Sequence, residues 1–358
     1  MTDIRVAEVI QAYAPGDGLN YAALKIADAL SRVKGFEVTF LHQRGNPQIK
    51  CARQETFLQS VRFIAKNADI AHSHIGMGVL KCNLAKAANP RVRHATTYSV
   101  IAPREHYPFY TRAMAFHKAA YAWGIDLAVG ISGYACADFE KKFHRPAKLI
   151  YDGVDVGQFR PDARAGARFR ETHGIEKGAT VLGYVSRFNP HKNHEEAIRS
   201  LAHLTKDAVL LLGGVGASKA TDTFEHCKRV AAGMGLEERV KFLGFIPDSQ
   251  LNPFYNAIDI HAFPSLWEGF GLNILEASAA GKPTVGYKVY SVQELVGERQ
   301  GNGFAVEGRK QFSEKLLQLV QEKRLRSRMG ARARAFAQKF AWEKVAQNYA
   351  REFRELAE

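Results

Sequence analysis

The stretch Ala262–Pro283 reads AFPSLWEGFGLNILEASAAGKP, and it sets the pattern for the second half of the chain. The apolar run Ile258–Phe263 predicts the end of a buried strand, and helical spacing begins at Leu272. Between them lie Gly269 and Gly271, which allow the backbone to approach a ligand closely. A strand, a glycine-containing loop and a helix N-terminus together offer unpaired backbone N–H groups to an anion.

Two carboxylates lie eight residues apart in this stretch. Glu268 is on the predicted loop, and Glu276 lies one helical turn after Asn273, on the same face. A loop that binds phosphate through its backbone and hydroxyls through its carboxylates suits a nucleotide sugar. Either acid alone is more often a charge at the favourable end of a helix dipole, so the hypothesis depends on the whole string.

The string PSLWEGFGLNILEASAAGKP resembles the signature of retaining, nucleotide-sugar-dependent glycosyltransferases of family four, glycosyl transferases group 1, which have the GT-B fold. The resemblance implies an α/β chain with two doubly wound Rossmann-like domains facing across a cleft. It also implies the following limits: residues 1–155 for the acceptor-side domain, 156–339 for the domain that binds the nucleotide sugar, and 340–358 for a C-terminal helix that crosses back to the first domain.

The residues themselves favour the same architecture. At 358 residues the chain is long enough for two domains of ordinary size. Ile4–Ile10 and Phe36–His42 read as strands separated by an amphipathic helix, and the alternation restarts at the predicted strand Thr180–Val185. Alternating strands and helices predict parallel sheets with ligand loops at the carboxyl ends of the strands. The last predicted helix begins near Trp342.

Charge is spread unevenly along the chain. The formal net charge is +14, and residues 1–150 hold 20 lysines and arginines against 11 acidic residues. A basic first half indicates an anionic partner, such as a phospholipid surface, nucleic acid or a phosphorylated acceptor. A solvated basic face with no partner is the plain alternative.

Cysteine usage and hydropathy bear on location. Four scattered cysteines (Cys51, Cys82, Cys136 and Cys227) argue against a disulfide framework or a zinc site and favour a reducing compartment. The N-terminal residues lead directly into a strand-like run, and no stretch approaches the ~20 apolar residues that span a bilayer. We expect a cytoplasmic protein, with peripheral attachment to the inner face of the cytoplasmic membrane as an open alternative.

Arg187 and Lys192 are the most suggestive basic pair. They lie on one predicted strand-to-helix loop, where two fixed cations can converge on a diphosphate. The alternative is two surface cations, but the spacing Gly-x-x-x-Arg-x-x-x-x-Lys from Gly183 resembles the family pattern. That resemblance implies that Arg187, Lys192 and Glu268 are the catalytic residues.

The resemblance also implies a set of donor-binding residues. Glu276 is expected to accept hydrogen bonds from the ribose diol. The first-half turn that contains Gly16 and Gly18 corresponds to the family's Gly-Gly loop, although most such turns are only turns. The full expected donor set is Gly16, Gly18, Gly214, Ile246, Phe270, Gly271, Leu272, Asn273 and Glu276.

The acceptor or sugar side is less defined. Asp69–His74 resembles the family's Asp-hydrophobic-hydrophobic-His-x-His strand end, where one histidine packs under the sheet and the other faces the cleft. Of the two, His74 is the candidate for the acceptor or sugar side. At the end of the next strand, Tyr98 stands where the family often has a catalytic-site histidine. This departure leaves Tyr98, Arg104 and His106 as open candidates for contacts with sugar hydroxyls.

The expected reaction is transfer of a hexose, with retention, from a UDP- or GDP-sugar to a hydroxyl of a glycan, glycolipid or small molecule, in cell-envelope or polysaccharide synthesis. No Asp-x-Asp motif is present, so no metal is expected. We also expect no other cofactor and no nucleic-acid partner. Two alternatives stay open: a non-catalytic protein that binds anionic lipid or nucleic acid, and a sugar-nucleotide epimerase of the same fold. The family resemblance ranks above both because neither explains the Glu-Gly-Phe-Gly string with its later glutamate.

Overall fold

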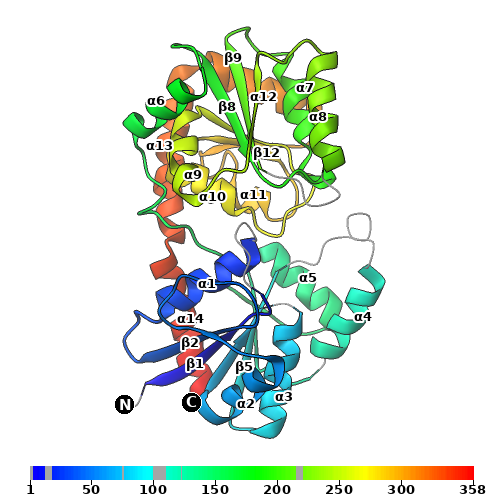
Figure 1. Ribbon diagram of the computed structural model, residues 1–358, viewed down its shortest axis with the longest axis vertical. Coiled ribbons are helices and arrows are strands. Elements are labelled where there is room, and N and C mark those ends of the chain that lie inside the picture. Colours follow the sequence, from blue (N-terminus) through cyan, green and yellow to red (C-terminus); the bar gives the residue numbers. More distant parts are fainter. Residues whose placement is uncertain (1–2, 13–17, 75, 100–109, 122, 215–220) are drawn as a thin grey trace. The chain divides into compact units, whose positions relative to one another are not determined.

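The computed structural model forms two compact units (Figure 1). Unit 1 comprises Met1–Gly153 and Phe340–Glu358, and unit 2 comprises Val154–Lys339. The structure describes residues 3–12, 18–74, 76–99, 110–121, 123–214 and 221–358. Among these residues, no helix is both long and apolar enough to cross a membrane.

Unit 1 is built around a parallel sheet of seven strands within its described residues, in the order β3-β2-β1-β4-β5-β6-β7. Its elements are β1 (Ile4–Val9), α1 (Gly18–Leu30), β2 (Phe36–His42), β3 (Ala52–Gln54), α2 (Phe57–Asn67), β4 (Ile70–Ser73), α3 (Met77–Ala88), β5 (Arg93–Tyr98), α4 (Tyr110–Tyr121), β6 (Leu127–Gly130), α5 (Gly133–Phe143), β7 (Lys148–Leu149) and α14 (Trp342–Ala357). The central strands β1 and β4 are buried on both faces, as expected for a parallel sheet covered by helices.

The C-terminal helix α14 belongs to unit 1, where it packs beside α1 (red and blue in Figure 1). Its apolar stripe contains Val345, Tyr349 and Phe353, spaced four residues apart and all buried. This spacing places the three side chains on one face of the helix, which therefore faces the core of unit 1.

Unit 2 has a parallel sheet of six strands within its described residues, in the order β10-β9-β8-β11-β12-β13. Its elements are α6 (Ala163–Thr172), β8 (Thr180–Val185), a 3-10 turn (Pro190–Lys192), α7 (His194–Leu201), β9 (Ala208–Gly213), α8 (Thr221–Gly233), β10 (Val240–Gly244), α9 (Asp248–Ala257), β11 (Ile260–Phe263), α10 (Leu272–Ala279), β12 (Thr284–Tyr287), α11 (Val292–Leu295), β13 (Gly303–Val306), α12 (Arg309–Gln321) and α13 (Lys323–Ala337). The predicted α/β class with two parallel sheets is confirmed.

The strand order reverses direction at one place in each sheet. In unit 1 the reversal lies between β1 and β4, and in unit 2 it lies between β8 and β11. At such a point the connections from neighbouring strands leave toward opposite faces of the sheet, which opens a crevice beyond the carboxyl ends of the strands. These two switch points are where side chains with binding chemistry have to be sought.

Candidate active site

At the switch point of unit 2, two loops run side by side. The β8 loop (Ser186–Asn193) follows β8, and the β11 loop (Pro264–Gly271) follows β11. They are joined by a backbone hydrogen bond in which Leu266 N donates to His191 O over 2.7 Å. Because β8 and β11 are adjacent parallel strands, their loops emerge at the same edge of the sheet.

An ion pair links the side chains of these loops. Lys192 Nζ lies 2.6 Å from Glu268 Oε1, and the two side chains are 15% and 8% exposed. Asn193 reinforces the junction by donating its amide to the carbonyl of Pro264 over 3.2 Å. The sequence predicted both Lys192 and Glu268 as catalytic residues, and the structure brings them together across 76 positions of sequence.

The third member of the predicted catalytic set, Arg187, lies on the same β8 loop. Its side chain is exposed, and within the described residues it forms no hydrogen bond or ion pair. Its guanidinium therefore keeps its donors available for an anion, although the same exposure also suits an ordinary surface cation.

Helix α10 begins at this switch point. Its N-cap is Gly271, in the left-handed conformation with φ +100°, and no side chain caps the helix. The amide of Asn273 donates to the carbonyl of Val185 over 3.0 Å, which ties the first turn of α10 to the end of β8. A helix N-terminus without a side-chain cap leaves backbone N–H groups and the positive end of the dipole for an anion. The helix starts at Leu272, as the sequence predicted.

Gly214 lies directly after β9 and next to the β8 loop. Its φ is +132°, and a Cβ added there would lie 1.8 Å from the carbonyl oxygen of Ser186. A residue with a side chain could not occupy this position without moving the β8 loop. Gly214 therefore lets the backbone after β9 approach the β8 loop closely.

Glu276 lies one turn into α10, where it accepts a hydrogen bond of 2.7 Å from the hydroxyl of Tyr255. Burial raises the pKa of Glu276 to about 7, although the hydrogen bond from Tyr255 acts in the opposite direction. The carboxylate is therefore only part-ionised near neutral pH, and its other oxygen is not used by Tyr255. Tyr255, on α9, had no motif to reveal it in the sequence.

The remaining residues of the expected donor set differ in their exposure. Ile246 and Phe270 are buried, so any contact with a ligand would come from their backbone rather than from an exposed ring or aliphatic chain. The carbonyl of Phe270 already accepts a hydrogen bond from Ser291 Oγ over 3.0 Å. In unit 1, Gly18 is the exposed first residue of α1, and Gly16 lies outside the described residues.

On the acceptor side, the expectation for Tyr98 needs correction. Tyr98 is fully buried, its hydroxyl donates to Asp138 Oδ2 over 2.6 Å, and its ring packs edge-on against Phe139 and Phe143. It is a core residue of unit 1 rather than a side chain presented to sugar hydroxyls, because its ring points from β5 toward α5. Arg104 and His106 lie outside the described residues.

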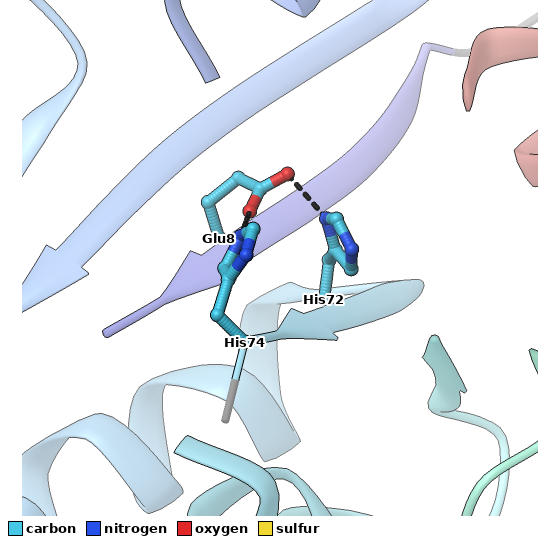
Figure 2. A group of neighbouring side chains, drawn as sticks. All are labelled: Glu8, His72 and His74. Carbon is cyan, nitrogen blue, oxygen red and sulfur yellow. Dashed lines mark hydrogen bonds and ion pairs between the residues drawn. The ribbon is translucent and has the colours of Figure 1, made fainter. Parts of the chain in front are cut away.

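His74 lies in a buried cluster with Glu8 and His72 (Figure 2). His72 Nδ1 is 2.5 Å from Glu8 Oε1, and His74 Nε2 is 3.0 Å from Glu8 Oε2. Burial alone would raise the pKa of Glu8, but the charge and hydrogen bond of His72, together with His74, lower it to about 2. His72 also packs against the rings of Tyr349 and Phe353 on α14.

This cluster is the group of described residues that could hold a metal ion, since one ligand atom from each side chain lies within 4.8 Å of the others. The sequence interpretation missed Glu8. A glutamate inside the apolar strand IRVAEV was the available signal, because an acid in a strand buried on both faces requires a partner.

Comparison with known proteins agrees with this geometry. Residues 167–336 match the model of the family described as "Glycosyl transferases group 1". The matched region contains β8, β11 and both loops of the switch point, so this part of the chain is similar to the glycosyl transferases group 1 family.

Among curated proteins, similarity extends to "D-inositol 3-phosphate glycosyltransferase" of Corynebacterium glutamicum, which is 33% identical over 204 residues. The match covers 54% of this chain and 48% of that protein, so the chain spans about half the length of the curated relatives it matches. The matching protein of Nocardia farcinica is 32% identical over 208 residues, covering 56% of this chain and 45% of that protein.

Solved structures share the fold over nearly the whole chain. Anabaena Alr3699/HepE in complex with UDP and glucose gives a TM-score of 0.86 at 20% identity, covering 98% of this chain and 100% of that chain. Sucrose-phosphate synthase from Thermosynechococcus elongatus gives 0.82 at 18% identity, covering 99% of each chain. The predicted GT-B fold class is thereby confirmed.

Proposed function

We propose that this protein is a retaining, metal-independent glycosyltransferase that moves a hexose from a nucleotide diphosphate sugar to a hydroxyl of a glycan, glycolipid or small molecule. The observation that carries the proposal is the unit 2 switch point. There, the Lys192–Glu268 pair, the glycine N-cap of α10 and the close approach at Gly214 combine at one edge of the sheet. Cation, helix N-terminus and carboxylates are the groups needed to bind a diphosphate and the hydroxyls on either side of it.

Each residue then has a distinct role in the proposal. Lys192, Arg187 and the first turn of α10 stabilise the negative charge that develops on the departing nucleoside diphosphate. Glu268 accepts from hydroxyls of the transferred sugar and balances the charge of Lys192. Glu276 accepts from the ribose hydroxyls. At an effective dielectric near 20, a cation about 4 Å from a phosphate charge contributes roughly 4 kcal/mol before desolvation. Only the part specific to the transition state accelerates the reaction.

The donor base and the acceptor are proposed by class. UDP-sugars come first, because Anabaena Alr3699/HepE, which has the same fold, is in complex with UDP-glucose in one structure; GDP-sugars are the alternative. D-inositol 3-phosphate is the first acceptor to test, because the curated relatives carry it in their names and the first half of the chain is basic. An anionic membrane surface is a further proposed partner of that basic half, within cell-envelope or polysaccharide synthesis.

The testing experiment is a thermal-shift screen of the purified chain against UDP- and GDP-sugars, followed by product analysis with the stabilising donor. A ligand at 100 times its Kd stabilises the folded state by about 2.7 kcal/mol, which shifts the melting temperature measurably. We expect one donor class to stabilise the protein and to transfer its sugar with retention. Binding without transfer to any hydroxyl acceptor, or product that is only the epimerised donor, would contradict the proposal.

Vesicle sedimentation tests the membrane part separately. Retention on anionic vesicles at low salt that is lost at high salt is the expected result, because the attraction is electrostatic and is screened by ions. Equal recovery with anionic and neutral vesicles at low salt would exclude this partner. Oligonucleotide binding without any effect of nucleotide sugars would instead favour the non-catalytic alternative.

A further inference from the structure

Unit 1 has its own switch point, and the side chains there are not used by the roles assigned above. Glu8 on β1 lies beside His72 on β4 in the sheet register, and β1 and β4 are the strands between which the order reverses. His74 is two residues further along the chain, so it projects to the same side as His72 (Figure 2). The cluster therefore lies where open parallel sheets bind ligands.

The hydrogen bonds of the cluster determine where its protons are. An ionised carboxylate can only accept, so a histidine nitrogen bonded to Glu8 must carry a proton. This places a proton on Nδ1 of His72 and on Nε2 of His74, at 2.5 and 3.0 Å from the two carboxylate oxygens. The second nitrogen of His72, Nε2, is bonded to Thr97 Oγ1 over 2.8 Å. Both ring nitrogens of His72 therefore have hydrogen-bond partners within unit 1.

His74 differs from His72 in its second nitrogen. When Nε2 of a neutral imidazole carries the proton, Nδ1 is a hydrogen-bond acceptor. Among the residues that the structure describes, Nδ1 of His74 has no hydrogen-bond partner, and the side chain is 2% exposed. Burial lowers the pKa of His74, which favours the neutral ring. The cluster thus presents one acceptor nitrogen whose direction and protonation are both set by Glu8.

We propose that Glu8 is a positioning residue that fixes His74 as the Nε2–H tautomer, so that Nδ1 of His74 accepts a hydrogen bond from a ligand hydroxyl. The identity of that hydroxyl, on the acceptor or on the transferred sugar, rests on the function proposed above. A metal ion is the competing occupant. However, both carboxylate oxygens already lie at hydrogen-bond distance from imidazole nitrogens, and an ion would have to displace both protons and separate these groups.

The first arm of the test is spectroscopic and does not require activity. Histidine-selective ¹H–¹⁵N spectra of the full-length protein, with the signal assigned by its loss in His74→Ala, should show His74 as the neutral Nε2–H tautomer. The Nδ1–H tautomer, or an imidazolium at pH 7.5, would overturn the proposal. Stoichiometric zinc bound by the wild type and lost in Glu8→Gln would also overturn it, because the cluster would then be a metal site.

The second arm is a kinetic double-mutant cycle. Glu8→Gln and His74→Ala should each lower kcat/KM about 10-fold for the substrate that donates the hydroxyl. The double variant should be no worse than His74→Ala, since Glu8 acts through His74. A change confined to the KM of the acceptor or of the donor identifies the source of the hydroxyl. Losses that multiply in the double variant would mean that Glu8 acts independently of His74, contrary to the proposal.

A matched control separates positioning from general loss of a buried acid. Glu352 on α14 is a buried carboxylate of the same unit, paired with Lys148 over 3.4 Å and outside the cluster. Glu352→Gln should leave both the His74 spectrum and the kinetics unchanged. A loss equal to that of Glu8→Gln would show that any buried acid of unit 1 has the same effect, and would overturn the assignment. If no nucleotide sugar is used at all, the proposed function fails while the tautomer result still decides the role of Glu8.

Discussion

The two switch points share a topology and differ in the chemistry they offer. At β1 and β4, Glu8 and His72 use their polar groups inside unit 1, and the cluster presents only an acceptor. At β8 and β11, Lys192 remains partly exposed and α10 begins without a side-chain cap. The same crevice geometry can therefore be specialised for a hydroxyl in one unit and for an anion in the other.

Removal of a cation from the unit 2 switch point should have the greatest effect on activity. Lys192→Ala or Arg187→Ala should lower turnover about 10²–10³-fold, because each removes a positive charge from the site of the developing diphosphate. Turnover with saturating donor is the measurement, and circular dichroism checks that the fold is retained. Lys288→Ala is the control, since Lys288 makes an exposed ion pair with Glu307 in the same unit. Turnover equal to that of the control would remove these roles.

The next effect concerns the close backbone approach that shapes the unit 2 switch point. Gly214→Ala should destabilise the protein by roughly 1–3 kcal/mol more than Gly178→Ala, because only the first places a Cβ against the Ser186 carbonyl. Gly178 also has a positive φ, +96°, but open space around its Cβ. Urea unfolding measures the difference. Equal stabilities of the two variants would show that the β8 loop moves at little cost to admit the Cβ, contrary to this prediction.

A smaller effect is expected in the pH dependence of donor binding at the unit 2 switch point. Since burial raises the pKa of Glu276 to about 7, the ionised carboxylate that accepts from ribose increases between pH 6 and 8. Affinity for the donor sugar should therefore rise with pH, by at most on the order of tenfold. Titration calorimetry of UDP-glucose at both pH values measures this change, and Glu276→Gln should abolish it. In Tyr255→Phe the rise should move to higher pH, because the lost hydrogen bond stabilised the ionised form. An unchanged slope in Glu276→Gln would assign the titration elsewhere.

Removal of divalent metal ions should leave turnover unchanged. Turnover should be the same before and after dialysis against EDTA, because cationic side chains and a helix N-terminus supply the positive charge in our account. Loss of activity that Mg²⁺ restores would place a metal in the donor site. Restoration of activity by Zn²⁺ alone would instead indicate a metal site formed by Glu8, His72 and His74.

Local patterns in the sequence predicted much of the fold. The limits expected for the strands Phe36–His42 and Thr180–Val185 are those of β2 and β8, and α10 begins at the expected residue, Leu272. These elements have strong apolar patterns and clear turn residues, so short-range information is sufficient. Lys192 and Glu268 were both expected as catalytic residues, but the ion pair between them was not predicted from the sequence.

Contacts between distant residues were harder to predict. Glu8 and His72 are 64 positions apart, and nothing local in either strand specifies the other. Tyr98 was misjudged because its direction is decided by helix α5, where Asp138 accepts its hydroxyl proton in a hydrogen bond. A residue at the end of a strand can point to the ligand edge or into the core, and the choice depends on packing that periodicity does not contain.

A crystal structure with bound UDP-glucose would show directly where the diphosphate binds. We expect the diphosphate at the β8–β11 switch point, with phosphate oxygens within about 3.2 Å of Lys192 Nζ and of backbone N–H groups in the first turn of α10. A diphosphate bound elsewhere, with Lys192 still paired only to Glu268 and the start of α10 without ligand, would contradict it.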